Sequence, residues 1–97
     1  MLLHIGNNVT VPLGALQFVL NARGMQPETK ALIDRARRAH RLRKCQGTPK
    51  SYVVVTERGR ETIYESILAS TTLMKRVREE TERKFLLEEA VLSITDA

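Results

Sequence analysis

The sequence contains no tryptophan, one cysteine and two histidines, and aromatic residues make up 4% of its 97 residues. With Cys45 alone, no disulfide can form within the chain, and a single thiol is typical of a reducing compartment. The histidines and the cysteine also lack the spacing of a zinc site. The sequence therefore excludes an internal disulfide framework, and we expect no bound metal.

Long apolar runs are absent as well. No stretch of about 18 apolar residues occurs, so we expect no membrane-spanning helix and no membrane partner. Residues 1–4 lack the positive charge and the long apolar region of a signal peptide. We therefore expect a cytoplasmic protein.

Residues that carry enzymatic chemistry are scarce. The sequence shows no nucleophile paired with a base, no paired carboxylates in apolar surroundings and no glycine-rich cofactor loop. Cys45 is interpreted as a small turn residue; the alternative is a reactive thiol, whose pKa Arg43 and Lys44 would lower if it were exposed. We expect neither enzymatic activity nor a cofactor.

Positive charge is present in excess and is unevenly distributed. The net charge is +5, from 16 basic and 11 acidic residues. Residues 1–78 hold 14 basic and five acidic residues, a net charge of +9, whereas residues 79–97 hold two basic and six acidic residues, a net charge of −4. A basic body with an acidic tail is typical of a protein that binds a polyanion.

The alternation of short apolar segments with turns predicts an α+β fold in one modest core. A chain of this size buries about 60 to 65% of its unfolded surface, so oligomerisation is a natural supplement to its stability. We expect a small antiparallel sheet, one packed amphipathic helix, and a C-terminal helix that starts near Ser70 and continues as an extension from residue 78. The expected strands are residues 2–5, 9–11, 16–20, 52–56 and 61–67.

Residues 27–44 form the expected packed helix. Pro27 suits a first helical position, and the helix is expected to end near Lys44, before Gly47. Its predicted core side consists of Leu32, Ile33, Ala36, Ala39 and His40.

The other side of this helix is either a solvated face or a contact surface for a polyanion. Five basic residues share it with a single acid, Asp34, whereas a merely solvated helix would mix both signs to form ion pairs. We favour contact with a polyanion. The five basic residues are Lys30, Arg35, Arg37, Arg38 and Arg41.

The helix is followed by a turn, residues 46–51, that combines glycine, hydroxyls and a lysine. It is not a P-loop, because the required spacing is absent and the order is helix, turn, strand. It is either a simple tight turn or a phosphate contact, for which Lys50, Arg43 and Lys44 are suitably placed.

The acidic segment from residue 79 onward continues an amphipathic helical pattern. Its apolar pairs Leu86-Leu87 and Val91-Leu92 exceed what one face of a small domain needs. Two interpretations stay open, a helix that binds a protein partner and simple packing on the core.

Three features of the basic body occur in a characteristic order. They are His4-Ile5-Gly6 with Asn7-Asn8, the helix near Pro27, and Gly47-Thr48-Pro49-Lys50-Ser51 before Val53-Val54-Val55. This succession resembles the RemA/RemB family of small bacterial regulators of extracellular-matrix genes. The resemblance spans residues 1–77 and is closer to the RemB branch through the GTPKS turn.

The resemblance implies a compact fold like that of LytTR-type DNA-binding domains. It also implies a ring-like homo-oligomer that binds DNA through repeated basic surfaces and controls transcription of biofilm matrix genes. In the RemA branch, arginines occupy an early position and two positions of the turn. Here those positions hold Gly14, Thr48 and Pro49, so Lys50 is the one charge left in the turn.

We therefore expect a DNA-binding domain, residues 1–77, and an acidic amphipathic helical extension, residues 78–97. The predicted function is a cytoplasmic, nucleoid-associated transcriptional regulator that binds double-stranded DNA as a homo-oligomer. The alternative is an oligomeric scaffold or protein-interaction module, without DNA binding, that uses the C-terminal helix. The predicted DNA-binding residues are Arg37, Arg38, Arg41, Arg43, Lys44, Thr48, Lys50 and Ser51.

Overall fold

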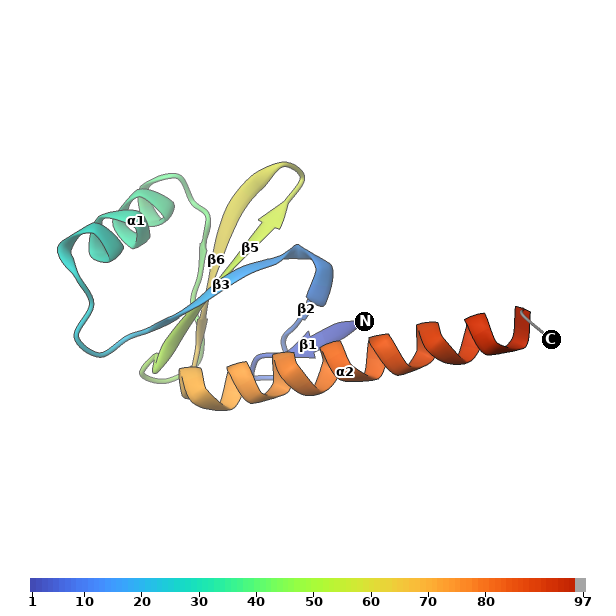
Figure 1. Ribbon diagram of the computed structural model, residues 1–97. Helices are drawn as coiled ribbons and strands as arrows, with labels where there is room; N and C mark the ends of the chain where they lie inside the picture. The colour runs from blue at the N-terminus through green and yellow to red at the C-terminus, as the bar shows by residue number, and fades with distance from the viewer. Residues whose placement is uncertain (96–97) are drawn as a thin grey trace.

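The computed structural model describes the backbone of residues 1–95 and the side chains of residues 1–88 (Figure 1). The α+β class predicted from the sequence is confirmed. In chain order the elements are β1 (Leu2–His4), β2 (Thr10–Pro12), the short 3-10 helix η1 (Leu13–Ala15), β3 (Leu16–Asn21), α1 (Pro27–Arg38), β4 (Leu42–Arg43), β5 (Ser51–Glu57), β6 (Arg60–Ser66) and α2 (Ser70–Thr95).

The main sheet has four strands in the order β3-β5-β6-β4. β5 pairs antiparallel with both β3 and β6, but β4 pairs with β6 in parallel. The sheet is therefore mixed, whereas the prediction was antiparallel throughout. β1 and β2 form a separate antiparallel hairpin.

The central strand β5 is buried on both faces, which explains its continuous apolar sequence. Because successive side chains of a strand point to opposite faces, Val53 and Val55 contribute to one cluster and Tyr52 and Val54 to the other. α1 covers one face through Ile33, and the β1-β2 hairpin with the first turns of α2 covers the other (Figure 1).

α1 ends at Arg38, so the predicted end near Lys44 is wrong. After a short turn, Leu42 and Arg43 form β4 at the edge of the sheet beside β6. Arg41, Arg43 and Lys44 therefore lie outside the helix.

The helix ends because His40 takes the left-handed backbone conformation, with a φ of 58°. The amide of His40 donates to the carbonyl of Arg37 at 3.1 Å, and the amide of Arg41 donates to the carbonyl of Ala36 at 2.7 Å. These two bonds form a Schellman cap, whose left-handed residue is usually glycine. Because the sequence has no glycine at this position, the end of the helix at Arg38 could not be predicted from it. Ala39 and His40 are exposed, and their predicted place in the core is wrong.

Replacing His40 with glycine is expected to stabilise the fold by about 0.5 to 1 kcal/mol. The left-handed conformation costs a residue with a Cβ about 1 to 2 kcal/mol, and the greater flexibility of glycine in the unfolded chain offsets part of the gain. Urea unfolding monitored by circular dichroism measures the change. Ala39→Gly is the control, because Ala39 has a φ of −87° and gains nothing from glycine. Equal effects of the two substitutions would contradict the cap.

Two buried serines join the β1-β2 hairpin and the start of α2 to the main sheet. The hydroxyl of Ser66 donates to the carbonyl of Ile5 at 2.6 Å and accepts a bond from the amide of Leu68 at 3.0 Å. The hydroxyl of Ser51 donates to the carbonyl of Leu68 at 2.7 Å. Every polar atom of this group is therefore satisfied away from water.

Ser66→Ala is expected to destabilise the protein by about 1 to 3 kcal/mol, because it leaves a buried carbonyl and a buried amide without a partner. The shift of the urea midpoint at constant slope measures the loss. Thr10→Ala removes a hydroxyl from an exposed residue and should change stability by less than about 0.5 kcal/mol. A similar loss in both variants would contradict the role assigned to Ser66.

α2 begins inside the body and then leaves it. Leu73 is fully buried and Val77 packs beside it, but the later part of the helix extends beyond the sheets (Figure 1). The molecule measures 54 × 26 × 24 Å as a result. Among the residues that the structure describes, no helix has the length and apolar character to cross a membrane.

Candidate nucleic-acid interface

Four arginines from two separate parts of the chain line one groove at the β4 edge of the main sheet. The groove has a volume of about 600 Å³. Two arginines come from the segment after α1 and two from the tip of the β5-β6 hairpin. Its lining residues are Arg41, Arg43, Glu57, Arg58, Arg60 and Thr62, and we call it the arginine groove.

Both the amide and the carbonyl of Arg41 form backbone hydrogen bonds. Its amide bonds to the end of α1 in the Schellman cap, and its carbonyl accepts a bond from the amide of Ile63 at 2.9 Å. Arg43 follows in β4, beside Tyr64 of β6, and its guanidinium donates to the carbonyl of His40 at 3.1 Å. The parallel pairing of β4 with β6 therefore places both arginines along the sheet edge.

Arg58 and Arg60 belong to the tight turn between β5 and β6. Glu57 and Arg60 are paired residues, so the connection consists of Arg58 and Gly59 alone. Both have positive φ, 52° and 76°, as a type I′ hairpin turn requires. Asparagine, aspartate and glycine are the residues favoured at the first of these positions. Arg58 therefore occupies a backbone position that suits arginine poorly.

The charge of the groove is strongly positive. Glu57 is the one carboxylate among its lining residues, and it accepts a hydrogen bond from the hydroxyl of Tyr64. Burial raises the pKa of Tyr64, the bond to Glu57 raises it further, and nearby Arg43 partly opposes the rise, so the hydroxyl keeps its proton. In the described part of the chain the two ion pairs are Arg37–Asp34 and Arg83–Glu80, neither of which involves the groove.

The structure divides the predicted DNA-binding residues among several places. Arg41 and Arg43 line the groove, whereas Lys44 is exposed just beyond β4. Arg37 and Arg38 are exposed on α1, where Arg37 pairs with Asp34 at 2.6 Å.

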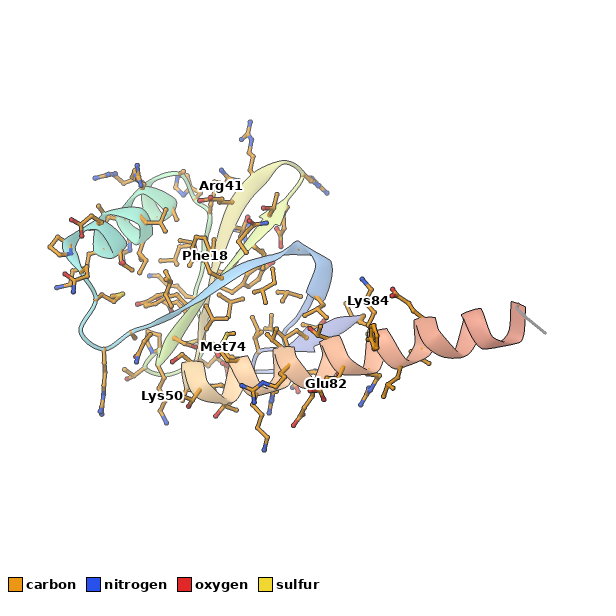
Figure 2. The ribbon with its side chains drawn as sticks, in the orientation of Figure 1. Phe18, Arg41, Lys50, Met74, Glu82 and Lys84 are labelled. Carbon is orange, nitrogen blue, oxygen red and sulfur yellow. The ribbon has the colours of Figure 1, made fainter. Side chains whose placement is uncertain are left out.

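The predicted turn lies at the other end of β5 from the groove. Figure 2 shows Arg41 and Lys50 on opposite sides of the body. Thr48 and Lys50 line a separate hollow of about 610 Å³ with Arg23 and the first turn of α2. Ser51 is fully buried and donates its hydroxyl to a backbone carbonyl, so the prediction that it contacts DNA is wrong.

The surroundings of Cys45 do not favour the alternative interpretation as a reactive thiol. Partial burial is the main cause that raises its pKa, and the carboxylate of Glu65 raises it further. The amide of Cys45 donates a hydrogen bond to the same carboxylate at 3.1 Å. The neighbouring Arg43 and Lys44 therefore do not produce a reactive thiolate, and the interpretation as a turn residue is favoured.

The sequence did not point to Arg58 and Arg60 as functional residues. Both fall between the predicted strands at residues 52–56 and 61–67, where no functional residue was predicted. The available signal was the arginine at a turn position that favours asparagine or glycine. In the described part of the chain no group of three or more histidine, cysteine, aspartate or glutamate residues is placed to hold a metal ion.

Comparison with known proteins adds no family assignment. No protein-family model matches the chain, and no curated protein sequence matches it. The resemblance to the RemA/RemB family therefore rests on the residues quoted above.

Proposed function

We propose that this protein binds double-stranded DNA through the arginine groove and acts as a transcriptional regulator of extracellular-matrix genes. The observation that carries DNA binding is the convergence of four arginines in one groove with a single carboxylate. The regulatory role, the action as a homo-oligomer and the association with the nucleoid rest on the resemblance to the RemA/RemB family. The cytoplasmic location rests on the single cysteine, which is typical of a reducing compartment.

Arginine suits this task because its planar guanidinium can donate two hydrogen bonds to one phosphate. Arg43, Arg58 and Arg60 are exposed, and Arg41 is half-buried. The side chains come from a sheet edge and a tight turn, which fix their backbones before DNA arrives. Contacts of this kind position a protein on the duplex, whereas sequence is read by contacts to base edges.

The salt dependence of binding tests the proposal. Fluorescence anisotropy of a labelled mixed-sequence duplex gives the association constant at several salt concentrations. Each phosphate contact contributes about 0.9 to the slope of log affinity against log salt, so four contacts predict a slope of about −3.6. Absence of binding at low salt, or binding that salt does not weaken, would contradict the proposal.

Arg58→Asn is expected to change stability and DNA binding in opposite directions. Asparagine tolerates the left-handed conformation better, so unfolding should cost about 0.5 to 1 kcal/mol more. Loss of one phosphate contact should make the slope of log affinity against log salt less negative by about 1. Urea unfolding and the anisotropy titration measure the two effects.

Lys30→Gln is the control for Arg58→Asn, since it removes one positive charge from an exposed position of α1. It should leave the salt slope nearly unchanged. Equal slopes for the two variants would show that net charge, and not the groove, determines binding.

The exposed apolar residues of α2 favour a second candidate function, an oligomeric scaffold or protein-interaction module without DNA binding. Phe85, Leu86 and Leu87 are 55 to 63% exposed. Light scattering of the pure protein with and without the duplex separates the two functions. A chain that ends at Val77 should keep DNA binding if the groove carries the function. Loss of a protein complex on this truncation, with no DNA binding by the full chain, would favour the scaffold.

A further inference from the structure

The strand β3 forms one edge of the main sheet, and its outer side is open. The order β3-β5-β6-β4 places β5 on one side of β3, and no strand of the described residues 1–95 lies on the other. Proteins usually protect such an edge with charged residues, proline or a bulge, because its amides and carbonyls pair readily with another chain. β3 contains no charged residue and no proline, and its bulge lies at the start, between Leu16 and Phe18. Residues 18–21 are therefore open to a further strand.

The hydrogen bonds of β3 show which backbone groups face this open edge. The amide of Ala22 donates to the carbonyl of Lys50 at 3.1 Å, so Ala22 turns its backbone toward β5. In an antiparallel pair every second residue does the same. Leu20 therefore bonds to β5, whereas Val19 and Asn21 turn their amides and carbonyls to the open edge.

Exposed apolar side chains accompany the edge on both faces of the sheet. Phe18 lies opposite Val54, on the face that α1 covers, and is 44% exposed. Leu20, two residues later on the same face, is only partly buried. Met74 of α2, which covers the other face, is 47% exposed. Figure 2 shows Phe18 above β3 and Met74 below it. A sheet that continued beyond β3 would cover these side chains.

A second copy of β3 is complementary to this edge. When two copies run antiparallel about a two-fold axis at Leu20, Val19 of each copy lies opposite Asn21 of the other. The outward amides and carbonyls of both residues then all find partners. Each Leu20 lies beside its own copy, and Phe18 lies diagonally opposite Leu20 of the other chain, within reach of an aromatic side chain.

The position of the arginine groove favours a second copy over an unrelated strand. Pairing of two β3 strands gives one sheet of eight strands with an arginine groove at each outer edge. Seven strand spacings separate the two β4 strands, a distance of about 34 Å. The sheet twists by about 150° over this distance, which turns the two antiparallel hairpin tips to the same side. One turn of DNA is about 34 to 36 Å long, so the two grooves match successive turns of one duplex.

We propose that β3 pairs in the antiparallel direction with β3 of a second copy of this chain, about a two-fold axis at Leu20. The main sheets of the two chains then form one continuous sheet. This pairing names the interface of the homo-oligomer and rests on the proposed function for that oligomer and for the spacing along DNA. The strand pairing itself needs no DNA, and β3 lies at the sheet edge opposite to the groove. The two can therefore be tested separately.

Disulfide cross-linking of single-cysteine variants tests the register. In a Cys45→Ser background, Leu20→Cys lies opposite its own copy with Cα atoms about 4.5 Å apart, and should give a covalent dimer under mild oxidation. Gln17→Cys is the control, because Gln17 is exposed on the same strand but would lie about 20 Å from its copy. It should stay monomeric. No dimer from Leu20→Cys, or equal dimers from both variants, would overturn the proposal.

A charge on the open edge tests the pairing without a cysteine. Because Phe18 is exposed, Phe18→Lys should leave the fold intact, and sedimentation should show a dimer dissociation constant raised by about 30-fold. Leu2→Lys adds the same charge at a side chain of β1 that is 55% exposed, and should leave the dimer unchanged. The amide of Val19 should exchange its hydrogen slowly in the dimer and rapidly in Phe18→Lys.

The outcomes separate this proposal from DNA binding. A dimer of unchanged affinity in Phe18→Lys, or rapid exchange at Val19 in the dimer, would contradict the strand pairing. A dimer that forms as described but binds no DNA would contradict the proposed function and leave the pairing standing. Conversely, DNA binding by a protein that forms no dimer would overturn the pairing alone.

Discussion

Replacement of Arg41, Arg43, Arg58 and Arg60 together by glutamine is expected to lower affinity for duplex DNA at low salt by about 100- to 1,000-fold. Each lost contact between a guanidinium and a phosphate removes a hydrogen bond worth about 0.7 to 1 kcal/mol net, and every 1.4 kcal/mol is a factor of ten in affinity. The slope of log affinity against log salt should become less negative by about 3.6, because counterions are no longer released at four phosphates. Anisotropy titrations at matched salt concentrations measure both changes.

The matched control replaces four cations outside the groove, Arg23, Lys30, Lys50 and Lys75. All four are exposed, and the net charge changes by the same amount. The control includes Lys50, the charge in the turn that resembles the RemA/RemB family. The control is expected to lose less than about tenfold, since long-range attraction alone is weakened and is screened by salt. Larger losses in the control than in the groove variant would assign DNA contact to the turn.

The second large effect is expected from Ile63→Ala. Ile63 is 1% exposed and packs with Ile33, Tyr52 and Val54 between α1 and the sheet. Truncation of a buried isoleucine to alanine removes apolar contacts and leaves a cavity, at a cost of about 2 to 5 kcal/mol. That is a large share of the stability of about 5 to 15 kcal/mol that is usual for a domain. Urea unfolding of the variant measures the loss.

Val9→Ala is the control for this substitution. Val9 is 37% exposed, so its truncation should cost less than about 1 kcal/mol. A loss below 1 kcal/mol in Ile63→Ala would show that α1 does not pack on this face of the sheet as described.

The sequence predicted the strands well because their patterns are local. Val53, Val54 and Val55 form a run that only a buried strand needs, and Gly59 marks the hairpin beside it. The start of α1 at Pro27 followed from the preference of proline for a first helical position. These signals act within a few residues, so they can be recognised without the tertiary structure.

The arginine groove could not be predicted because it depends on contacts between distant residues. His40 ends α1 in a conformation that usually requires glycine, and β4 is too short to show a strand pattern. Its pairing with β6 brings Arg43 beside Tyr64, 21 positions later in the chain. The sequence therefore identified Arg41 and Arg43 as basic residues of one helix, whereas they line a groove with Arg58 and Arg60.

The most direct measurement is an NMR titration of the isotope-labelled protein with a short DNA duplex at low salt. It follows the side-chain N–H signals of arginine together with the backbone amides. The groove predicts that the signals of Arg43, Arg58 and Arg60 shift along with the amide of Gly59, while the amide of Thr48 stays in place. Shifts confined to Thr48 and its neighbours, or to α1, would contradict DNA contact at the groove.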